Sequence, residues 1–203
     1  MNTIIVGNRK IEPSKIICVG RNYVEHIKEL NNEIPEKMVI FLKPNSAISH
    51  KLNSFHKEQI HYEAELCFLY ENGRFSAVGF GLDLTKRELQ NKLKSKGLPW
   101  ERAKAFDGSA LFSKFVEIQS INPNLSIELS INGKNVQSGD INQMIYKPDA
   151  ILTELQTFIS LSDGDIVMTG TPKGVGIVSK GSVFVGKVIE NNEVLTSAEW
   201  VAI

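Results

Sequence analysis

The sequence has 203 residues, in which 23 Lys and Arg balance 23 Asp and Glu. This balance provides no positive field for nucleic acid, so we expect no nucleic-acid partner. No stretch approaches about 18 apolar residues, and the start of the chain does not read as a signal peptide, so we expect no membrane association. Cys18 and Cys67 make neither a disulfide framework nor a zinc site. We therefore expect a reduced, cytoplasmic protein.

The first half of the chain alternates short β-rich runs with two helical patterns. Strands are predicted at residues 16–19, 39–42, 63–69 and 77–82. A helix is predicted over 23–30 and another over 85–96, where Thr85 and Glu88 have the spacing of a capping box and Gly97 ends the helix.

The second half continues the β-rich pattern. A strand over 125–131 leads into Asn132-Gly133, which predicts a hairpin. A helix begins at Asp149 with a core-facing apolar stripe that includes Phe158 and extends to Ile159. Further strands are predicted at 165–169, 183–189 and 195–201, and Asn191-Asn192 is predicted to close a hairpin. No repeat or linker divides the chain. The sequence thus predicts one α+β, mainly β domain over residues 1–203, built as a sandwich or roll.

Three acidic residues occur where a strand is expected. Glu63 and Glu65 alternate along one strand and so point the same way, either into water or toward a shared cation. Asp83 interrupts the apolar run AVGFGLDL, where an unpaired carboxylate would be costly. Three carboxylates would suit Mg²⁺ or Mn²⁺, but solvent exposure and helix capping remain alternatives.

A second set of polar residues lies on the helix at 23–30 and in two loops. His26 and Glu29 share one helical face, as a general-base dyad or as part of a solvated surface. Arg21 and Asn22 occupy a tight polar turn after a strand, a typical place for a site loop. In TGTPKGVG, Thr171 and the backbone N–H groups either hold an anionic oxygen or simply form a sharp turn.

Together these segments resemble the fumarylacetoacetate hydrolase superfamily. The similarity rests on CVGRNYVEHIKEL, FLKPNSAI, HYEAEL, GLDLTKRELQ, KGLPWERAKAFDGS and GDIVMTGTPKGVG, which occur in the family's order between residues 16 and 176. The segments look most like those of the short acylpyruvate hydrolases and oxaloacetate-acting members.

The resemblance implies a mixed β-sandwich roll, a homodimer and dependence on Mg²⁺ or Mn²⁺. It implies metal ligation by Glu63, Glu65 and Asp83, and a general-base dyad of His26 and Glu29. It also implies that substrate is contacted by Lys104, Arg87, Gln90 and Thr171.

The implied reaction is hydrolysis of a small acylpyruvate-type 2-oxo acid to pyruvate and a carboxylic acid. His26 would activate water, and Lys104 would help to stabilise the enolate. The same enolate would serve an oxaloacetate decarboxylase, a keto–enol tautomerase or an isomerase of an unsaturated 2-oxo diacid. A non-catalytic, calcium-binding β-sandwich is the alternative outside the enzymes.

Overall fold

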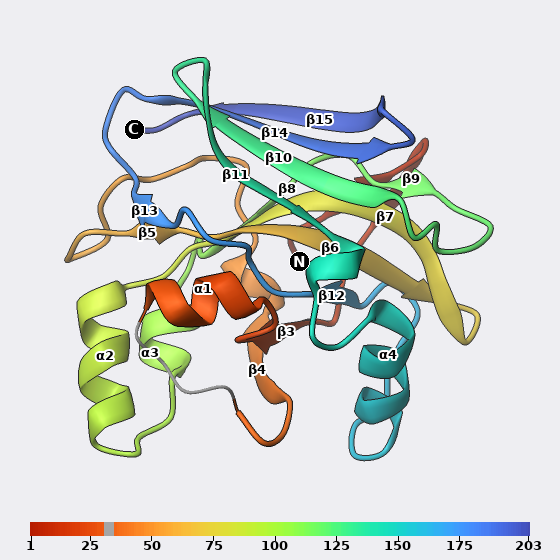
Figure 1. The fold of residues 1–203 in the computed structure, drawn as a ribbon, viewed down its shortest axis with the longest axis horizontal. Coiled ribbons are helices and arrows are strands. Elements are labelled where there is room, and N and C mark those ends of the chain that lie inside the picture. The colour runs from red at the N-terminus through yellow and green to blue at the C-terminus, as the bar shows by residue number, and fades with distance from the viewer. Residues whose placement is uncertain (31–34) are drawn as a thin grey trace.

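The computed structural model describes residues 1–30 and 35–203, and within them two β-sheets pack face to face (Figure 1). The larger sheet has seven strands, β4 (Val39–Pro44), β3 (Lys15–Gly20), β12 (Ile166–Met168), β6 (Ala64–Glu71), β7 (Arg74–Asp83), β8 (Ala110–Phe112) and β9 (Val116–Glu117), the last paired with β7. The smaller sheet has four strands, in the order β11 (Lys134–Asp140), β10 (Leu125–Ile131), β14 (Val183–Glu190) and β15 (Glu193–Val201).

Short strands and helices surround these sheets. Two strand pairs are formed by β1 (Ile4–Val6) with β2 (Arg9–Ile11) and by β5 (His61–Tyr62) with β13 (Gly176–Ile177). The helices are α1 (Val24–Glu29), α2 (Arg87–Ser95), α3 (Glu101–Lys104) and α4 (Pro148–Gln156), with 3₁₀ turns at Asn45–Ala47 and Ile141–Gln143. Figure 1 shows α1, α2 and α3 gathered at one end of the sheets. No helix in the described ranges is long and apolar enough to cross a membrane.

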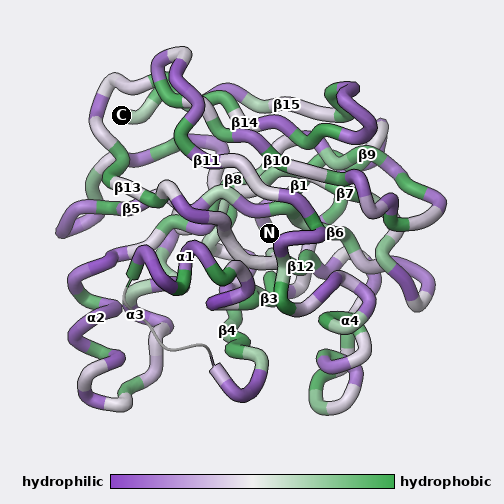
Figure 2. The backbone as a smooth tube through the Cα atoms, viewed as in Figure 1, coloured by the Kyte–Doolittle hydropathy of each residue, from purple (hydrophilic) through white to green (hydrophobic). Residues whose placement is uncertain are grey.

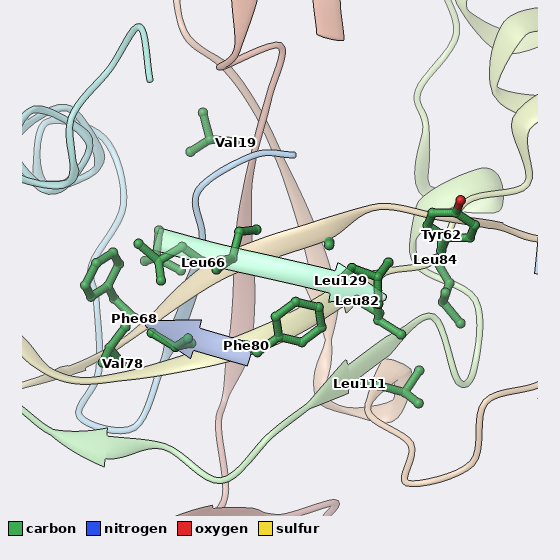
Figure 3. Close-up of a cluster of buried hydrophobic side chains, with 14 of the residues drawn as sticks. Val19, Tyr62, Leu66, Phe68, Val78, Phe80, Leu82, Leu84, Leu111 and Leu129 are labelled. Atoms are coloured by element: carbon green, nitrogen blue, oxygen red, sulfur yellow. The ribbon is translucent and has the colours of Figure 1, made fainter. Parts of the chain in front are cut away.

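Side-chain alternation along the strands builds a core on each face of the larger sheet. On β6, Leu66 and Phe68 face the four-stranded sheet, whereas Cys67 and Leu69 join a second cluster on the opposite face. Figure 3 shows the first cluster, where Phe80 of β7 lies among the apolar side chains. In Figure 2 hydrophilic residues dominate α2, whose outer surface is solvated. Both faces of β6 are thus buried, and any polar side chain on it needs a partner.

The predicted mainly β fold is confirmed, and the predicted strands are present with ends that differ by no more than three residues. The Asn132-Gly133 hairpin is confirmed, because both residues have the positive φ angles, 51° and 79°, of a type I′ turn. Asn191 and Asn192 close the β14–β15 hairpin in the same way, with φ angles of 50° and 68°.

Two predicted details of the helices are wrong. Thr85 does not cap α2, which begins at Arg87 with no side-chain hydrogen bond at its N-cap. The Thr85 hydroxyl is buried and instead accepts a hydrogen bond from Lys104 Nζ. Phe158 is not in the core: α4 ends at Gln156, before the apolar stripe is complete, and Phe158 is 60 % exposed.

The contact between the sheets gives a stability prediction. A Cβ atom on Gly186 of β14 would lie 2.3 Å from the Phe80 ring, so the Gly186→Ala variant must displace the ring or separate the sheets. We expect the free energy of unfolding to fall by about 1–3 kcal/mol in urea titrations, as overpacking typically costs. Ser197→Ala, at an exposed position of β15 in the same sheet, is the matched control. Equal stability of the two variants would contradict this account of the sheet contact.

Candidate active site

Three buried acidic residues meet at one end of the β6–β7 pair. Glu63 lies in the break between β5 and β6, Glu65 lies on β6, and Asp83 ends β7. The strands are antiparallel, and the backbone N–H of Asp83 donates to the carbonyl of Glu63 at 2.8 Å. Each residue offers a carboxylate oxygen within 4.8 Å of the others, and none is more than 5 % exposed. The structure therefore brings the three acidic residues together, while their role as ligands stays a prediction.

Cationic side chains surround this acidic cluster. Lys104, from the end of α3, places its Nζ 2.8 Å from Glu63 Oε2 and 2.7 Å from Asp83 Oδ2. Lys43, from β4, places its Nζ 2.8 Å from Asp83 Oδ1, and Arg87 at the start of α2 pairs with Glu63 Oε1. Each of these ion pairs is shielded from solvent, so removing one charged partner would disturb the balance of buried charges.

The three acids do not share these cations equally. Burial alone would raise the pKa of Glu63, but Lys104 and Arg87 outweigh it and hold that pKa well below its usual range. The pKa of Glu65 is raised well above its usual range, by burial first and then by the negative charges of Asp83 and Glu63. A hydrogen bond of 2.7 Å from the Gly170 backbone N–H opposes this shift without reversing it.

The site residues fit a divalent metal ion of the hard, oxygen-binding kind. The cluster offers only carboxylate oxygens, which suit Mg²⁺ or Mn²⁺. A cation bound among the three groups would also stabilise the ionised form of Glu65, which its present neighbours disfavour. Because Lys104 already contacts two of the acids, it would lie beside such an ion.

The dyad on α1 faces this acidic cluster. His26 Nδ1–H donates to Glu29 Oε2 at 3.1 Å, which leaves Nε2 of the ring as a proton acceptor. Glu29 Oε1 accepts a hydrogen bond of 2.9 Å from the Gly174 backbone N–H, so one carboxylate ties the helix to the loop after β12. Burial lowers the pKa of His26, and Arg87 adds to this effect, although Glu63 and Glu29 oppose it. The imidazole is therefore neutral at pH 7 and able to act as a base.

A pocket of about 440 Å³, including the solvent at its mouth, opens over these groups. Arg21, Arg87, Gln90 and Thr171 line it together with His26, Lys104 and the three acids. Arg21 has a φ of 56°, a left-handed conformation that is uncommon for a side chain of this size and typical of functional loops. The additional lining residues are Val19, Gly20, Leu30, Phe41, Lys94 and Trp100.

Two of the predicted site residues lie behind the pocket wall. Glu29 contacts His26 rather than the pocket itself. Asn22 is fully buried, and its amide donates to the carbonyls of Thr169 and Tyr146 at 2.8 and 2.9 Å while accepting from the Tyr146 backbone N–H at 2.7 Å. With its polar atoms engaged in this way, Asn22 joins the turn before α1 to the loop after β12 and is not placed to contact substrate.

Two polar residues near the site were missed from the sequence. Lys43 is fully buried within an apolar strand, the same kind of anomaly that drew attention to Asp83, and could have been found by that signal. Gln137 of β11 is 1 % exposed and bonds to Ala64 and Thr171, residues far from it in sequence. No local pattern marks Gln137, because β11 reads as the polar return strand of a hairpin.

Comparison with known proteins identifies the family. The family model for the fumarylacetoacetate (FAA) hydrolase C-terminal domain matches residues 15–74 and 75–197. The oxaloacetate tautomerase YcgM of Escherichia coli is 38 % identical over 186 residues, which cover 83 % of this chain and 85 % of that protein. The human mitochondrial oxaloacetate tautomerase FAHD1 is 36 % identical over 182 residues, covering 81 % and 82 % of the two chains.

A solved structure supports the same relationship. The fumarylpyruvate hydrolase from Pseudomonas aeruginosa, in complex with Mn²⁺ and pyruvate, superposes with a TM-score of 0.87 at 27 % identity and covers 100 % of this chain and 96 % of its own. Sequence, fold and the converging site residues thus agree: the chain belongs to the fumarylacetoacetate hydrolase family of enzymes.

Proposed function

We propose that this enzyme interconverts the keto and enol forms of oxaloacetate or a closely similar 2-oxo diacid, with Mg²⁺ or Mn²⁺ bound by Glu63, Glu65 and Asp83. The observation that carries the proposal is the meeting of an acidic cluster, a buried lysine and a neutral histidine base in one pocket. The similarity to oxaloacetate tautomerases and to an Mn²⁺- and pyruvate-bound neighbour supports it.

The charges around the pocket favour a dianionic substrate. Arg21, Arg87, Lys94 and Lys104 line the pocket beside the three acids. With a divalent cation added, the positive charges at the pocket exceed the negative ones, which suits a molecule with two carboxylates. Gln90, whose side chain accepts a hydrogen bond of 2.7 Å from Arg87, helps to orient that guanidinium along the pocket wall.

Proton transfer is assigned to the dyad. His26 Nε2 accepts a proton from carbon 3 of the keto form, and Glu29 stabilises the resulting imidazolium. A bound divalent cation supplies Lewis-acid stabilisation of the negative charge on the 2-oxo oxygen. The Lys104 ammonium, which contacts Glu63 and Asp83, would add a second positive charge to stabilise the enolate. Protonation of the enolate on oxygen gives the enol, and protonation on carbon 3 restores the keto acid.

Hydrolysis of an acylpyruvate is the second candidate. The same His26–Glu29 pair is suited to activating water, and the Pseudomonas neighbour is a fumarylpyruvate hydrolase. Decarboxylation of oxaloacetate would use the same enolate without water. We rank tautomerisation first because the curated relatives with the higher identities carry that activity in their names. Family membership also favours an enzyme over the calcium-binding module considered from the sequence.

The test follows the enol absorbance of freshly dissolved oxaloacetate by stopped flow, with Mg²⁺, with Mn²⁺ and with EDTA. We expect metal-dependent acceleration of keto–enol equilibration that EDTA abolishes, and no matching release of pyruvate. Release of pyruvate at the rate of enol loss would identify a decarboxylase instead. Preferential cleavage of acetylpyruvate would identify the hydrolase.

A second prediction concerns the base. His26→Ala should slow the metal-dependent reaction by about 10²–10⁴-fold, the usual contribution of a positioned base, without weakening Mg²⁺ binding. Because the pKa of His26 is lowered, the neutral base persists below the ordinary imidazole pKa of about 6.5, so the acid limb of kcat/KM should lie below that pH. Glu29→Gln removes a charge that raises this pKa and should move the limb to still lower pH. An acid limb above pH 7, or unchanged turnover in His26→Ala, would contradict the assignment.

A further inference from the structure

Gln137 connects the smaller sheet to the strand and the loop that carry the acidic cluster and Thr171. It lies on β11, and its amide reaches the larger sheet, where Oε1 accepts a hydrogen bond of 3.0 Å from the backbone N–H of Ala64. Its Nε2 donates to Thr171 Oγ1 at 2.9 Å and to the Pro172 carbonyl at 2.8 Å. One buried side chain thus joins the residue between Glu63 and Glu65 to the loop that carries Thr171.

These partners fix which way the amide points. The Ala64 N–H only donates, so the atom facing it must be the carbonyl oxygen of Gln137. The Pro172 carbonyl only accepts, so the atom facing it must be the amide nitrogen. The Thr171 oxygen is therefore held as the acceptor of an N–H from Gln137.

This arrangement determines the role left to the Thr171 hydroxyl. A hydroxyl that already accepts a hydrogen bond still has one proton to donate. Within the loop the Pro172 carbonyl lies 3.4 Å from this hydroxyl, which is long for a hydrogen bond from an O–H group. Because Thr171 lines the pocket beside the acidic cluster, its proton is available to a ligand.

We propose that Gln137 is a positioning residue for ligand recognition: it holds Thr171 as a hydrogen-bond donor toward a carboxylate or carbonyl oxygen of the substrate. The inference rests on the proposed function for the class of substrate. The same side chain holds Ala64, so it also fixes the distance between this donor and the acids on either side of Ala64. The Thr171 oxygen uses one lone pair to accept from Gln137 and keeps its proton for the ligand, which favours a hydrogen-bond acceptor such as a carboxylate or carbonyl oxygen at this end of the pocket.

A double-mutant cycle tests this coupling. The dissociation constant of pyruvate, in saturating Mg²⁺, is measured by isothermal titration calorimetry for wild type, Gln137→Met, Thr171→Val and the double variant. Each single variant should bind pyruvate about tenfold more weakly, because it loses a hydrogen bond to a charged group. The double variant should bind pyruvate no more weakly than Thr171→Val alone, because Gln137 acts through Thr171. Thr171→Ser, which keeps the hydroxyl, should bind within about threefold of wild type.

Mg²⁺ affinity, titrated without pyruvate, separates this role from a structural one. The Thr171→Val variant should bind Mg²⁺ with the affinity of the wild type. The loss of pyruvate affinity in Gln137→Met should persist when Mg²⁺ is saturating. Losses that multiply in the double variant, or unchanged pyruvate binding in Gln137→Met, would overturn the inference.

A second variant covers the case in which Gln137→Met does not fold. Gln137→Glu keeps the shape and the acceptor for Ala64, and it should weaken pyruvate binding in the wild-type background but not in the Thr171→Val background. Equal weakening in both backgrounds would overturn the inference. If pyruvate binds and Gln137 and Thr171 are coupled, but oxaloacetate is not turned over, only the proposed reaction is overturned. If the wild type binds no pyruvate, both the proposed reaction and the role of Gln137 are overturned.

Discussion

The mutual repulsion of three buried carboxylates is the constraint around which this site is built. Glu63, Glu65 and Asp83 offer oxygens within 4.8 Å of one another in the interior, where like charges repel strongly. Lys43 and Lys104 compensate Asp83 and Glu63, whereas the pKa of Glu65 remains raised. Burial and the negative charges of Asp83 and Glu63 cause this shift, and a divalent cation bound among the three groups would favour the ionised form of Glu65.

The fold brings the remaining groups to this cluster from distant parts of the chain. Glu29 links the dyad helix to the Gly174 backbone, and Gln137 links the smaller sheet to Thr171 in the same loop. A Cβ atom on Gly174 would lie 2.0 Å from the Val136 carbonyl, so that position requires glycine. The loop after β12 therefore connects the His26–Glu29 dyad, the Thr171 hydroxyl and the acidic cluster. We interpret the site as one hydrogen-bonded unit, in which a substitution at one residue also affects its hydrogen-bonded neighbours.

The sequence predicted the features whose signal is local. Asp83 was conspicuous because it interrupts an apolar strand, and the alternation of Glu63 and Glu65 indicated a common direction. The same reasoning misassigned Thr85, whose hydroxyl satisfied a capping pattern in sequence but bonds to Lys104 in space. Gln137 was invisible for the same physical reason: its partners lie in another sheet, and sheet-to-sheet packing leaves no spacing pattern in the chain. The resemblance to a family supplied the roles that periodicity could not.

Formation of an enolate is the central claim, and it is shared by every reaction considered for this pocket. Its most direct measurement is the exchange of the methyl protons of pyruvate for deuterium in D₂O, followed by proton NMR with Mg²⁺ or Mn²⁺ present. The account predicts exchange that requires the wild-type enzyme and the metal together, and that is lost both in EDTA and in the His26→Ala variant. Exchange no faster than with buffer and metal alone, although pyruvate binds, would contradict it.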